Sequence, residues 1–509
     1  MRKRTWFVLV ALLGALALVA AACAEEEGGG ATGPTATGPV EDPMGTVEVG
    51  PGEPITIGTL LAISGDVAFL GLDSQYGVEL AVDYLDGAFD GKPGQIAGHD
   101  VELVNEDDGC SAEGGQAGAT KLAADPQMVA VIGTSCSSAA LGVADQILAD
   151  KGIMLISPSN TNPNLTAEGV WTGWYARTAH NDKIQGAIVA NFAYDELGAR
   201  SAATINDESP YADALAAVFR EVFESKGGTI TAAEAIQSTD TDFKPLLTSI
   251  GQQSPDVLYF PDFNPACALI TKQAADVPGL KDTALIGSDG CADPSYTDTA
   301  GDAANGAYIS QPDTSAFQQG DFYQNEFLPA YKELVGKDPT AAFHAHAFDA
   351  FNILARAIEQ VAIQHDDGSL TIPRTALKDA VLATSGYQGI IGTITCNEFG
   401  DCATEVTIGI YQVPDVPFLD PKAKPVFSQT LSLEGRGVVP PRVARCGVGG
   451  SPTPHPRPER ATRVPAMSEQ AATERRLGRA SNACPRARSP SSSSRSRWRR
   501  RSPTARSAR

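Results

Sequence analysis

Apolar residues between positions 55 and 433 follow two alternating patterns. Short continuous runs, such as residues 55–61 and 128–132, have the length and the β-branched content of buried strands. Longer stretches between them have helical spacing; Val78, Ala81 and Val82 fall at positions i, i+3 and i+4. This alternation predicts a mostly parallel sheet with helices on both faces.

The pattern restarts after Arg177 and continues to the end of this region. The predicted strands are 55–61, 101–104, 128–132, 153–156, 202–205, 229–236, 257–260 and 284–286, and the clearest helices are 138–151, 212–226, 322–335 and 345–362. About 380 residues of α/β pattern are too many for one small sheet. We therefore expect two α/β lobes with a cleft between them.

Residues 1–23 have the features of a lipoprotein signal peptide. Positive residues at 2–4 precede an apolar run, 6–22, and small residues lead to Cys23. Cys23 is then the lipidated first residue of an exported, membrane-anchored protein that faces the periplasm or the cell exterior. The alternative is an uncleaved anchor helix of 17 residues. The next residues, 24–53, are rich in Gly, Pro and Glu and are predicted to form a flexible tether.

The charge of the chain is divided unevenly. The net charge is −22, but residues 436–509 hold 18 Arg and three Glu, so the preceding chain carries −37. An acidic body argues against a general nucleic-acid binder, which needs cations to neutralise phosphates. The Arg-, Ser- and Pro-rich stretch 436–509 has no structural period and is predicted to be disordered. It is interpreted as a basic arm for anionic polymers or lipids or, preferably, as an out-of-frame translation of GC-rich DNA.

Six of the nine cysteines lie in the α/β region, at positions 110, 136, 267, 291, 396 and 402. Six cysteines allow fifteen sets of pairs. Pairing neighbours keeps each bond within one predicted βα unit or hairpin, which favours Cys110–Cys136, Cys267–Cys291 and Cys396–Cys402. An exported protein can keep such bonds oxidised. Metal binding is disfavoured because no CxxC pair or nearby set of histidines accompanies these cysteines.

Two successive predicted strands end in loops rich in hydroxyl groups, residues 133–138 and 157–163. Ligands of open parallel sheets bind beyond the carboxyl ends of the strands, and free N–H groups at a helix start favour an anion such as a carboxylate. Alternatively, Ser137, Ser159 and Thr161 only cap helices and turns. The presence of both loops favours the binding interpretation.

Asp289 follows the predicted strand 284–286 and could pair with a ligand ammonium group, although Asp-Gly is also an ordinary turn signal. An anion site on one lobe facing an acid on the other would recognise a zwitterion, which suggests a free amino acid. Tyr211, Phe263 and Phe343 lie near other element ends and could form the wall of a side-chain pocket. Core packing explains each of these aromatic residues equally well.

Several motifs follow one another in a fixed order: Ile57-Gly58, Ser64-Gly65, the run 156–166, Thr241-Asp242-Phe243, Pro255-Asp256-Val257, Ser288-Asp289-Gly290, 300–306 and Phe348-Asp349-Ala350. As an ordered set over about residues 54–433, they resemble the leucine/isoleucine/valine-binding proteins, which are type I periplasmic substrate-binding proteins of ABC importers. The resemblance implies two lobes joined by three crossing strands that close around a ligand. It implies lobe 1 at 54–178 plus 309–402 and lobe 2 at 179–308 plus 403–435.

By position in that family, Ser137 and Thr161 would hold the ligand carboxylate, and the Ser159 carbonyl and Asp289 would hold its ammonium group. Tyr211 and Phe263 would contribute from the second lobe. The pair Cys110–Cys136 matches the disulfide of the family. Leu70 stands where some members have an aromatic side-chain contact, so the anchor for an amino acid carries over better than the side-chain specificity.

The function implied is an extracytoplasmic solute-binding lipoprotein without cofactor or metal. It would capture a branched-chain or other aliphatic amino acid and deliver it to the permease of an ABC transporter. The alternatives are a short amide or an aromatic acid as the ligand, or a sensor that reports to a separate membrane receptor. An enzyme is disfavoured because none of the six histidines lies in a nucleophile-elbow, HExxH or phosphate-loop motif.

Overall fold

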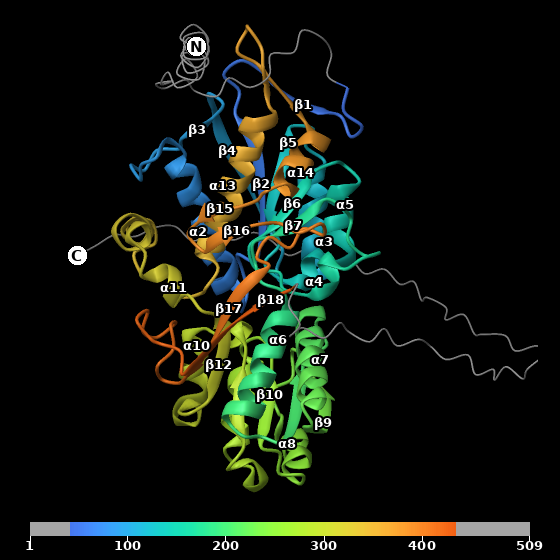
Figure 1. Ribbon diagram of the computed structural model, residues 1–509, viewed down its shortest axis with the longest axis vertical. Coiled ribbons are helices and arrows are strands. Elements are labelled where there is room, and N and C mark those ends of the chain that lie inside the picture. Colours follow the sequence, from blue (N-terminus) through green and yellow to red (C-terminus); the bar gives the residue numbers. More distant parts are fainter. Residues whose placement is uncertain (1–40, 434–509) are drawn as a thin grey trace, which may run out of the picture. The chain divides into compact units, whose positions relative to one another are not determined.

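The structure is a computed structural model, and it describes residues 41–433. This part of the chain forms two α/β lobes, each built on a sheet of its own (Figure 1). The predicted signal peptide with Cys23, residues 24–40 of the predicted tether and the tail 436–509 lie outside the described residues. None of the helices within residues 41–433 has both the length and the apolar character needed to span a bilayer.

The first lobe contains a sheet of six strands in the order β3-β4-β2-β5-β6-β7. All neighbouring strands are parallel except the β3–β4 pair. Their bounds are β2 (Ile55–Leu61), β3 (Gln95–Ile96), β4 (His99–Asp107), β5 (Met128–Gly133), β6 (Met154–Ser157) and β7 (Tyr175–Arg177). Strands β2, β5 and β6 are buried along their whole length, as expected for a parallel sheet covered on both faces.

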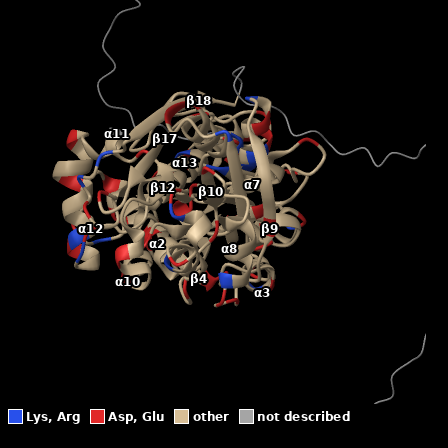
Figure 2. Ribbon diagram, turned by 90° about the horizontal axis from the view of Figure 1, so that it is seen from below, with Lys and Arg blue, Asp and Glu red and all other residues tan. Residues whose placement is uncertain are grey.

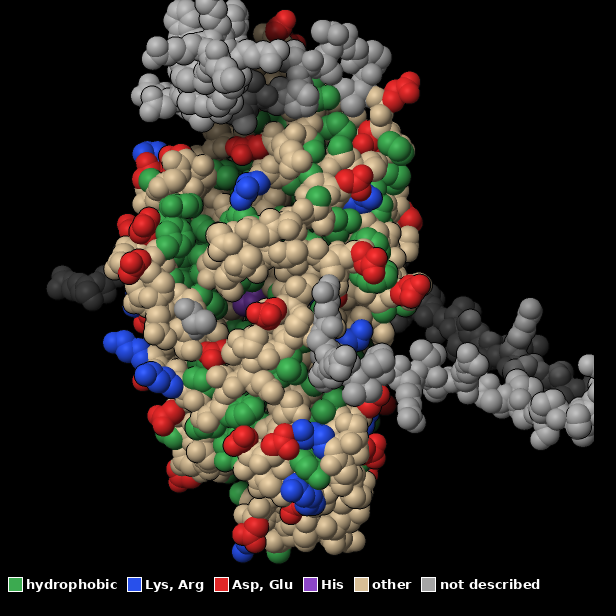
Figure 3. Space-filling view, in the orientation of Figure 1, with side chains coloured by type: hydrophobic (Ala, Val, Ile, Leu, Met, Phe, Trp, Pro, Cys, Tyr) green, Lys and Arg blue, Asp and Glu red, His purple; other side chains and the backbone are tan. Residues whose placement is uncertain are grey.

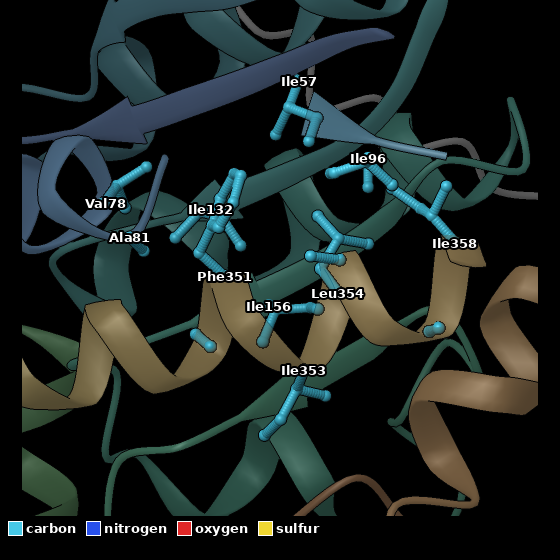
Figure 4. Packing of buried hydrophobic residues seen from close by; sticks show 14 of the residues in the cluster. Ile57, Val78, Ala81, Ile96, Ile132, Ile156, Phe351, Ile353, Leu354 and Ile358 are labelled. Atoms are coloured by element: carbon cyan, nitrogen blue, oxygen red, sulfur yellow. The ribbon is translucent and has the colours of Figure 1, made fainter. Parts of the chain in front are cut away.

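Helices cover both faces of this sheet because successive strand residues point to opposite sides. Ile57 and Ile132 point to the face where Phe351 of a long helix packs (Figure 4). Leu60 and Val131 belong to the core on the other face. The covering helices are α2 (Ala68–Asp83) and α13 (His344–Val361) on the first face, and α3 (Ala112–Ala123) and α5 (Asp145–Ala149) on the second. Helices α12 (Leu328–Val335) and α14 (Arg374–Leu382) add to the first face.

The second lobe has seven strands in the order β18-β17-β12-β11-β10-β8-β9. The bounds are β8 (Ser201–Asn206), β9 (Thr229–Ala235), β10 (Val257–Phe260), β11 (Ala284–Gly287), β12 (Tyr308–Pro312), β17 (Glu405–Gln412) and β18 (Phe427–Ser432). Helices α6 (Asp182–Asn191) and α7 (Pro210–Ser225) pack on one face, and α8 (Lys244–Gly251), α9 (Ala266–Ala274) and α10 (Pro294–Ala300) on the other. Only β17 and β18 run antiparallel to their neighbours.

The chain crosses between the lobes three times, after β7, after β12 and after the hairpin of β15 (Tyr387–Gly389) and β16 (Gly392–Ile394). The second crossing comes later than the predicted boundary at residue 309. The reason is that β12 pairs with β11 and β17, so residues 309–312 belong to the sheet of the second lobe. The two-lobed fold of the prediction is confirmed, with this shift of one boundary.

The tether prediction is wrong for the described residues 41–53. Strand β1 (Thr46–Val49) pairs antiparallel with β14 (Leu370–Pro373), and Val47 and Val49 are buried. Asp42 accepts hydrogen bonds from the N–H groups of Thr375 and Ala376 at the start of α14. These residues therefore belong to the first lobe.

The predicted helix 138–151 is interrupted. It consists of α4 (Ser137–Ala139), a π-helical turn (Ala140–Ala144) and α5, with non-helical backbone at Leu141 and at Gly142, where φ is +76°. The spacing of apolar residues does not reveal such a break, because the residues before and after it still pack on the same side, against the core of the first lobe. The helix that starts at Ser137 is only one turn long. Its dipole therefore favours an anion at this loop less than the dipole of the predicted continuous helix would.

Three disulfide bonds join Cys110 to Cys136, Cys267 to Cys291 and Cys396 to Cys402. These are the three pairs predicted from proximity in the sequence. The first lies beside the loop after β5, the second joins α9 to the residues that follow β11, and the third closes a turn in the third crossing.

Acidic positions are distributed over the helices and loops of both lobes, with fewer basic positions among them (Figure 2). On the face seen in Figure 3, charged side chains of both signs are scattered and do not gather into one basic patch.

Candidate ligand-binding site

The two hydroxyl-rich loops lie side by side at the end of the first sheet. Strands β5 and β6 are parallel neighbours, so their carboxyl ends meet at one edge. The Ser159 hydroxyl donates to the Ser135 carbonyl at 2.9 Å, and the Asn162 N–H donates to the Ser137 hydroxyl at 3.2 Å. The expected adjacency of Ser137, Ser159 and Thr161 is therefore found.

The loop after β5 is fixed by a buried acid. Both oxygens of Asp108 accept backbone N–H groups, from Cys110 at 2.7 Å and from Ser135 at 2.7 Å. Burial raises the pKa of Asp108 to about 7, although these N–H donors oppose the rise. The Asp108 side chain is fully buried, so the loop is held from inside the first lobe.

Gly133 allows this loop to leave the sheet. Its φ is +150°, and a Cβ atom there would lie 2.1 Å from the Leu60 carbonyl oxygen. A larger residue would clash with the neighbouring strand β2, so the glycine is required by the close approach of two backbones.

Thr161 differs from the two serines because its hydroxyl has no well-formed hydrogen bond. The side chain is 1% exposed, and Oγ1 is among the buried polar atoms without a partner. Its carbonyl accepts the N–H of Asp182 at 3.0 Å. The hydroxyl lies near enough to the Asp182 carboxyl to oppose the rise in its pKa, but the two groups do not form a well-formed hydrogen bond. Because a poorly satisfied buried hydroxyl is costly, Thr161 is suited to a ligand that offers it a better partner.

Asp289 lies where it was predicted, directly after β11, and its side chain is 6% exposed. Its Oδ1 atom accepts hydrogen bonds from Gln185 Nε2 at 2.8 Å and from the Tyr211 hydroxyl at 3.0 Å. The Tyr211 hydroxyl is also 2.7 Å from the Ser288 hydroxyl. Burial and the charge of Asp289 raise the pKa of Tyr211 well above its ordinary value, so the phenol stays neutral and acts as a donor.

Asp182, at the start of α6, is a buried acid that the sequence analysis missed. The residue is fully buried, and neither carboxylate oxygen has a well-formed hydrogen bond. Burial and, secondarily, the charge of Asp289 raise the pKa of Asp182 well above its ordinary value, while the nearby Thr161 hydroxyl opposes the rise. Asp182 therefore lies close to both Thr161 and Asp289 and connects the two halves of the predicted site.

Within residues 41–433 no cation forms an ion pair with either acid, although the charge of Arg177 opposes the rise in the pKa of Asp182. Burial lowers the pKa of His180, so its ring is neutral; Nε2 contacts Gln185 at 2.5 Å, and Nδ1 has no partner. Arg177 is engaged with Asp401 at 2.6 Å. The Tyr259 hydroxyl adds another buried group without a partner. Two acids without an ion-pair partner favour a positively charged guest.

Aromatic residues from both lobes meet beside these polar groups. The Phe263 and Tyr211 rings are 5.1 Å apart, and Phe263 also packs against Leu70, Ala179 and Phe343. The predicted aromatic wall is thus assembled, with Leu70 as an aliphatic member. The lobes also touch through Asn162 Nδ2, which donates to the Pro210 carbonyl at 2.5 Å. The polar residues of the site are nearly inaccessible to solvent, whereas Phe263 is partly exposed.

Two further buried histidines, His344 and His346, have structural partners. His344 Nδ1 contacts Asp73 at 3.1 Å and Nε2 contacts the Tyr323 hydroxyl at 3.0 Å, whereas His346 contacts the Ala342 carbonyl. Within residues 41–433 no group of three or more His, Cys, Asp or Glu side chains is arranged to hold a metal ion. The polar groups of the site can bind and orient a guest, but they include no nucleophile with an adjacent base.

The sequence and the fold of the chain were compared with those of known proteins. The sequence profile of the family described as periplasmic binding protein matches residues 54–408. Over 351 residues the chain is 29% identical to the Leu/Ile/Val-binding protein BraC3 of Rhizobium johnstonii, which covers 69% of this chain and 89% of that protein.

Two solved structures share the fold. The branched-chain amino acid transporter substrate binding protein LivJ of Streptococcus pneumoniae, in complex with isoleucine, gives a TM-score of 0.62 at 24% identity and covers 74% of this chain and 99% of its own. A solute binding protein of an ABC transporter from R. palustris, in complex with benzoate, gives 0.60 at 20% identity and covers 74% and 96%. The extent of the profile match, together with this fold, shows that the chain belongs to the periplasmic binding protein family and that its role is to bind a solute.

Proposed function

We propose that the protein captures an amino acid with an aliphatic side chain between its two lobes. The observation that carries the proposal is the pair of buried acids, Asp182 and Asp289, close to the unpartnered hydroxyl of Thr161. An ammonium group between the acids would pair with the Asp289 carboxylate and would favour the ionised form of Asp182, whose pKa burial raises. The Thr161 hydroxyl and the Ser137 side of the loop would receive the carboxylate of the same ligand.

The side chain of the ligand would contact Phe263 and Leu70. Both residues belong to the apolar cluster that joins the two lobes beside the acids. The cluster supplies apolar surface without a further charged partner, which suits an aliphatic group. The name of the R. johnstonii relative, a Leu/Ile/Val-binding protein, agrees with this ligand class.

We further propose that the protein is exported, lipidated at Cys23 and paired with the permease of an ABC transporter. The signal-peptide pattern of residues 1–23 supports export and lipidation, and the solved relative LivJ is a transporter substrate binding protein. Metabolic labelling with a radioactive or clickable fatty acid tests the anchor. Cys23→Ala should abolish the label, and a label retained in that variant would exclude Cys23 as the site.

Titration calorimetry on the full chain tests the ligand class. The panel contains leucine, isoleucine, valine and alanine, with 4-methylpentanamide, 4-methylpentanoate and benzoate as comparisons. We expect the amino acids to bind and 4-methylpentanoate, which lacks the ammonium group, to bind weakly. Tight binding of benzoate or of an uncharged amide, with no binding of amino acids, would contradict the proposal and favour an aromatic acid or an amide as the ligand.

A further inference from the structure

Arg177 is a fully buried arginine at the first crossing between the lobes. Its Nε atom donates to Asp401 Oδ1 at 2.6 Å. One terminal nitrogen donates to the carbonyls of Asn160 at 3.1 Å and Asn162 at 2.9 Å, and the other donates to the Thr166 hydroxyl at 2.7 Å. Four of the five guanidinium N–H groups thus have an acceptor, as a buried charge requires.

Three of these acceptors belong to the loop after β6. Asn160 and Asn162 flank Thr161 directly, and Thr166 closes the same segment in a short 3-10 helix (Pro163–Thr166). Arg177 thus fixes the peptide units on both sides of the residue that carries the unpartnered hydroxyl.

The fourth acceptor, Asp401, comes from the third crossing, which is more than 200 residues away in sequence. The backbone reinforces the link: the Arg177 N–H donates to the Gly400 carbonyl at 2.9 Å, and the Cys402 N–H donates to the Arg177 carbonyl at 3.0 Å. The first and third crossings therefore lie side by side at this point.

The turn that carries Asp401 is closed by the Cys396–Cys402 disulfide. Within the turn, Asn397 Oδ1 accepts the N–H groups of Phe399 and Asp401, and Phe399 packs edge-on against Trp171 at 5.9 Å. Gly400 has φ +84°, and a Cβ atom there would lie 2.3 Å from the Tyr175 carbonyl oxygen. The turn is thus held against β7 in one conformation, and Asp401 is 4% exposed.

We propose that Arg177 is a positioning residue for the ligand loop, and that Asp401, held by the Cys396–Cys402 turn, fixes the orientation of Arg177. The contacts run from the disulfide through Asp401 and Arg177 to the carbonyls on either side of Thr161. The geometry of the hinge and the geometry of the binding loop are therefore coupled. The part of this inference that concerns affinity rests on the proposed amino-acid function, whereas the part that concerns loop order does not.

The test uses the full chain with two changes that leave Arg177 in place. Asp401→Asn keeps the shape of the acceptor and removes its charge, and the double change Cys396→Ser with Cys402→Ser opens the turn while keeping Asp401. Asp276→Asn is the matched control, because it removes the charge from an exposed ion pair with Lys244 in the second lobe.

The first measurement is hydrogen exchange of the unliganded chain at a temperature where every variant is folded. We expect exchange in peptides covering residues 157–166 to be on the order of tenfold faster in both test variants, the scale on which partners that orient a ligand group act. Exchange in peptides covering α7 should stay as in the unmodified chain. The control should change neither region.

The second measurement is the Kd for leucine and for alanine. Because the loop faces the groups that both amino acids share, both Kd values should rise by the same factor, on the order of tenfold, and their ratio should stay constant. A role in stability alone would lower the melting temperature without moving the exchange of residues 157–166 or the two Kd values, and that result would overturn the proposal. If the unmodified chain binds no amino acid, the proposed function fails, and the exchange of residues 157–166 alone then supports or overturns the positioning role.

Discussion

Replacing Asp289 by Asn probes the predicted ammonium contact with little change of shape. The amide oxygen of an asparagine can still accept from Tyr211 and Gln185, which both donate to Oδ1 of the present carboxylate. The hydrogen bonds that hold the side chain in place are therefore retained. The variant loses only the negative charge, in a residue that is 6% exposed.

The size of the effect follows from the burial of the contact. A hydrogen bond to a charged group contributes about 1.5–3 kcal/mol, and about 1.4 kcal/mol corresponds to a tenfold change of Kd. Asp182 remains as a second acid close by, so the larger penalty for a completely unpaired buried charge does not apply. We expect the Kd for leucine to rise by roughly tenfold to a hundredfold.

Calorimetry with two ligands separates the charge effect from general damage. Leucine carries the ammonium group, whereas 4-methylpentanoate has the same carbon skeleton and carboxylate without it. Asp289→Asn should weaken leucine and leave 4-methylpentanoate unchanged or slightly improved, because one repulsive charge is gone. Asp276→Asn is the control for loss of an acid. An unchanged Kd for leucine, or an equal loss for both ligands, would refute an ammonium contact at Asp289.

Three further predictions concern single residues. Thr161→Val removes a buried hydroxyl that has no well-formed hydrogen bond. Thermal unfolding should therefore show unchanged or slightly higher stability, while the leucine Kd rises roughly tenfold or more. A loss of stability without a loss of affinity would contradict this prediction. Burial raises the pKa of Asp108 from 3.8 to about 7 in the folded chain. The folded chain therefore binds this proton more tightly than the unfolded chain does. The contribution of Asp108 to the free energy of unfolding falls as the pH rises from about 4 to 7. Relative to the unmodified chain, Asp108→Asn should therefore gain up to about 1.4 kcal/mol of unfolding free energy per pH unit between pH 5 and 7, measured by urea denaturation; a pH-independent difference would exclude the effect. Gly77→Ala would place a Cβ atom 2.2 Å from the His344 carbonyl oxygen where α2 meets α13, and should lower stability by about 1–3 kcal/mol; an unchanged denaturation midpoint would show that the helices can separate freely.

The sequence predicted the parts of the fold that depend on local pattern. Strands such as β5 and β10 are continuous apolar runs, and α13 has a long helical period, so their types follow from burial on one or two faces. The loops after β5 and β6 could be placed together because consecutive βα units put strands side by side. Asp289 was found for the same reason, as an acid at a strand end.

The features that the sequence did not predict depend on partners distant in the chain. Strand β1 lies in a stretch rich in Gly and Pro, and its partner β14 is more than 300 residues away. Asp182 looks like an ordinary acid in the first turn of a helix, where acids are common. Its proposed role follows only from Thr161 and Asp289, which come from two other segments and lie near it in the fold. The one local signal was Asn181-Asp182 at the start of the second lobe, directly after a crossing.

The most direct test of the account is a crystal structure of the chain grown with L-leucine. We expect leucine to be enclosed between the lobes. Its ammonium group should lie within hydrogen-bond distance of Asp182 and Asp289, and its carboxylate should lie at Ser137 and the Thr161 hydroxyl. Leucine bound elsewhere, or bound in the cleft with its ammonium group away from both acids, would contradict the central claim.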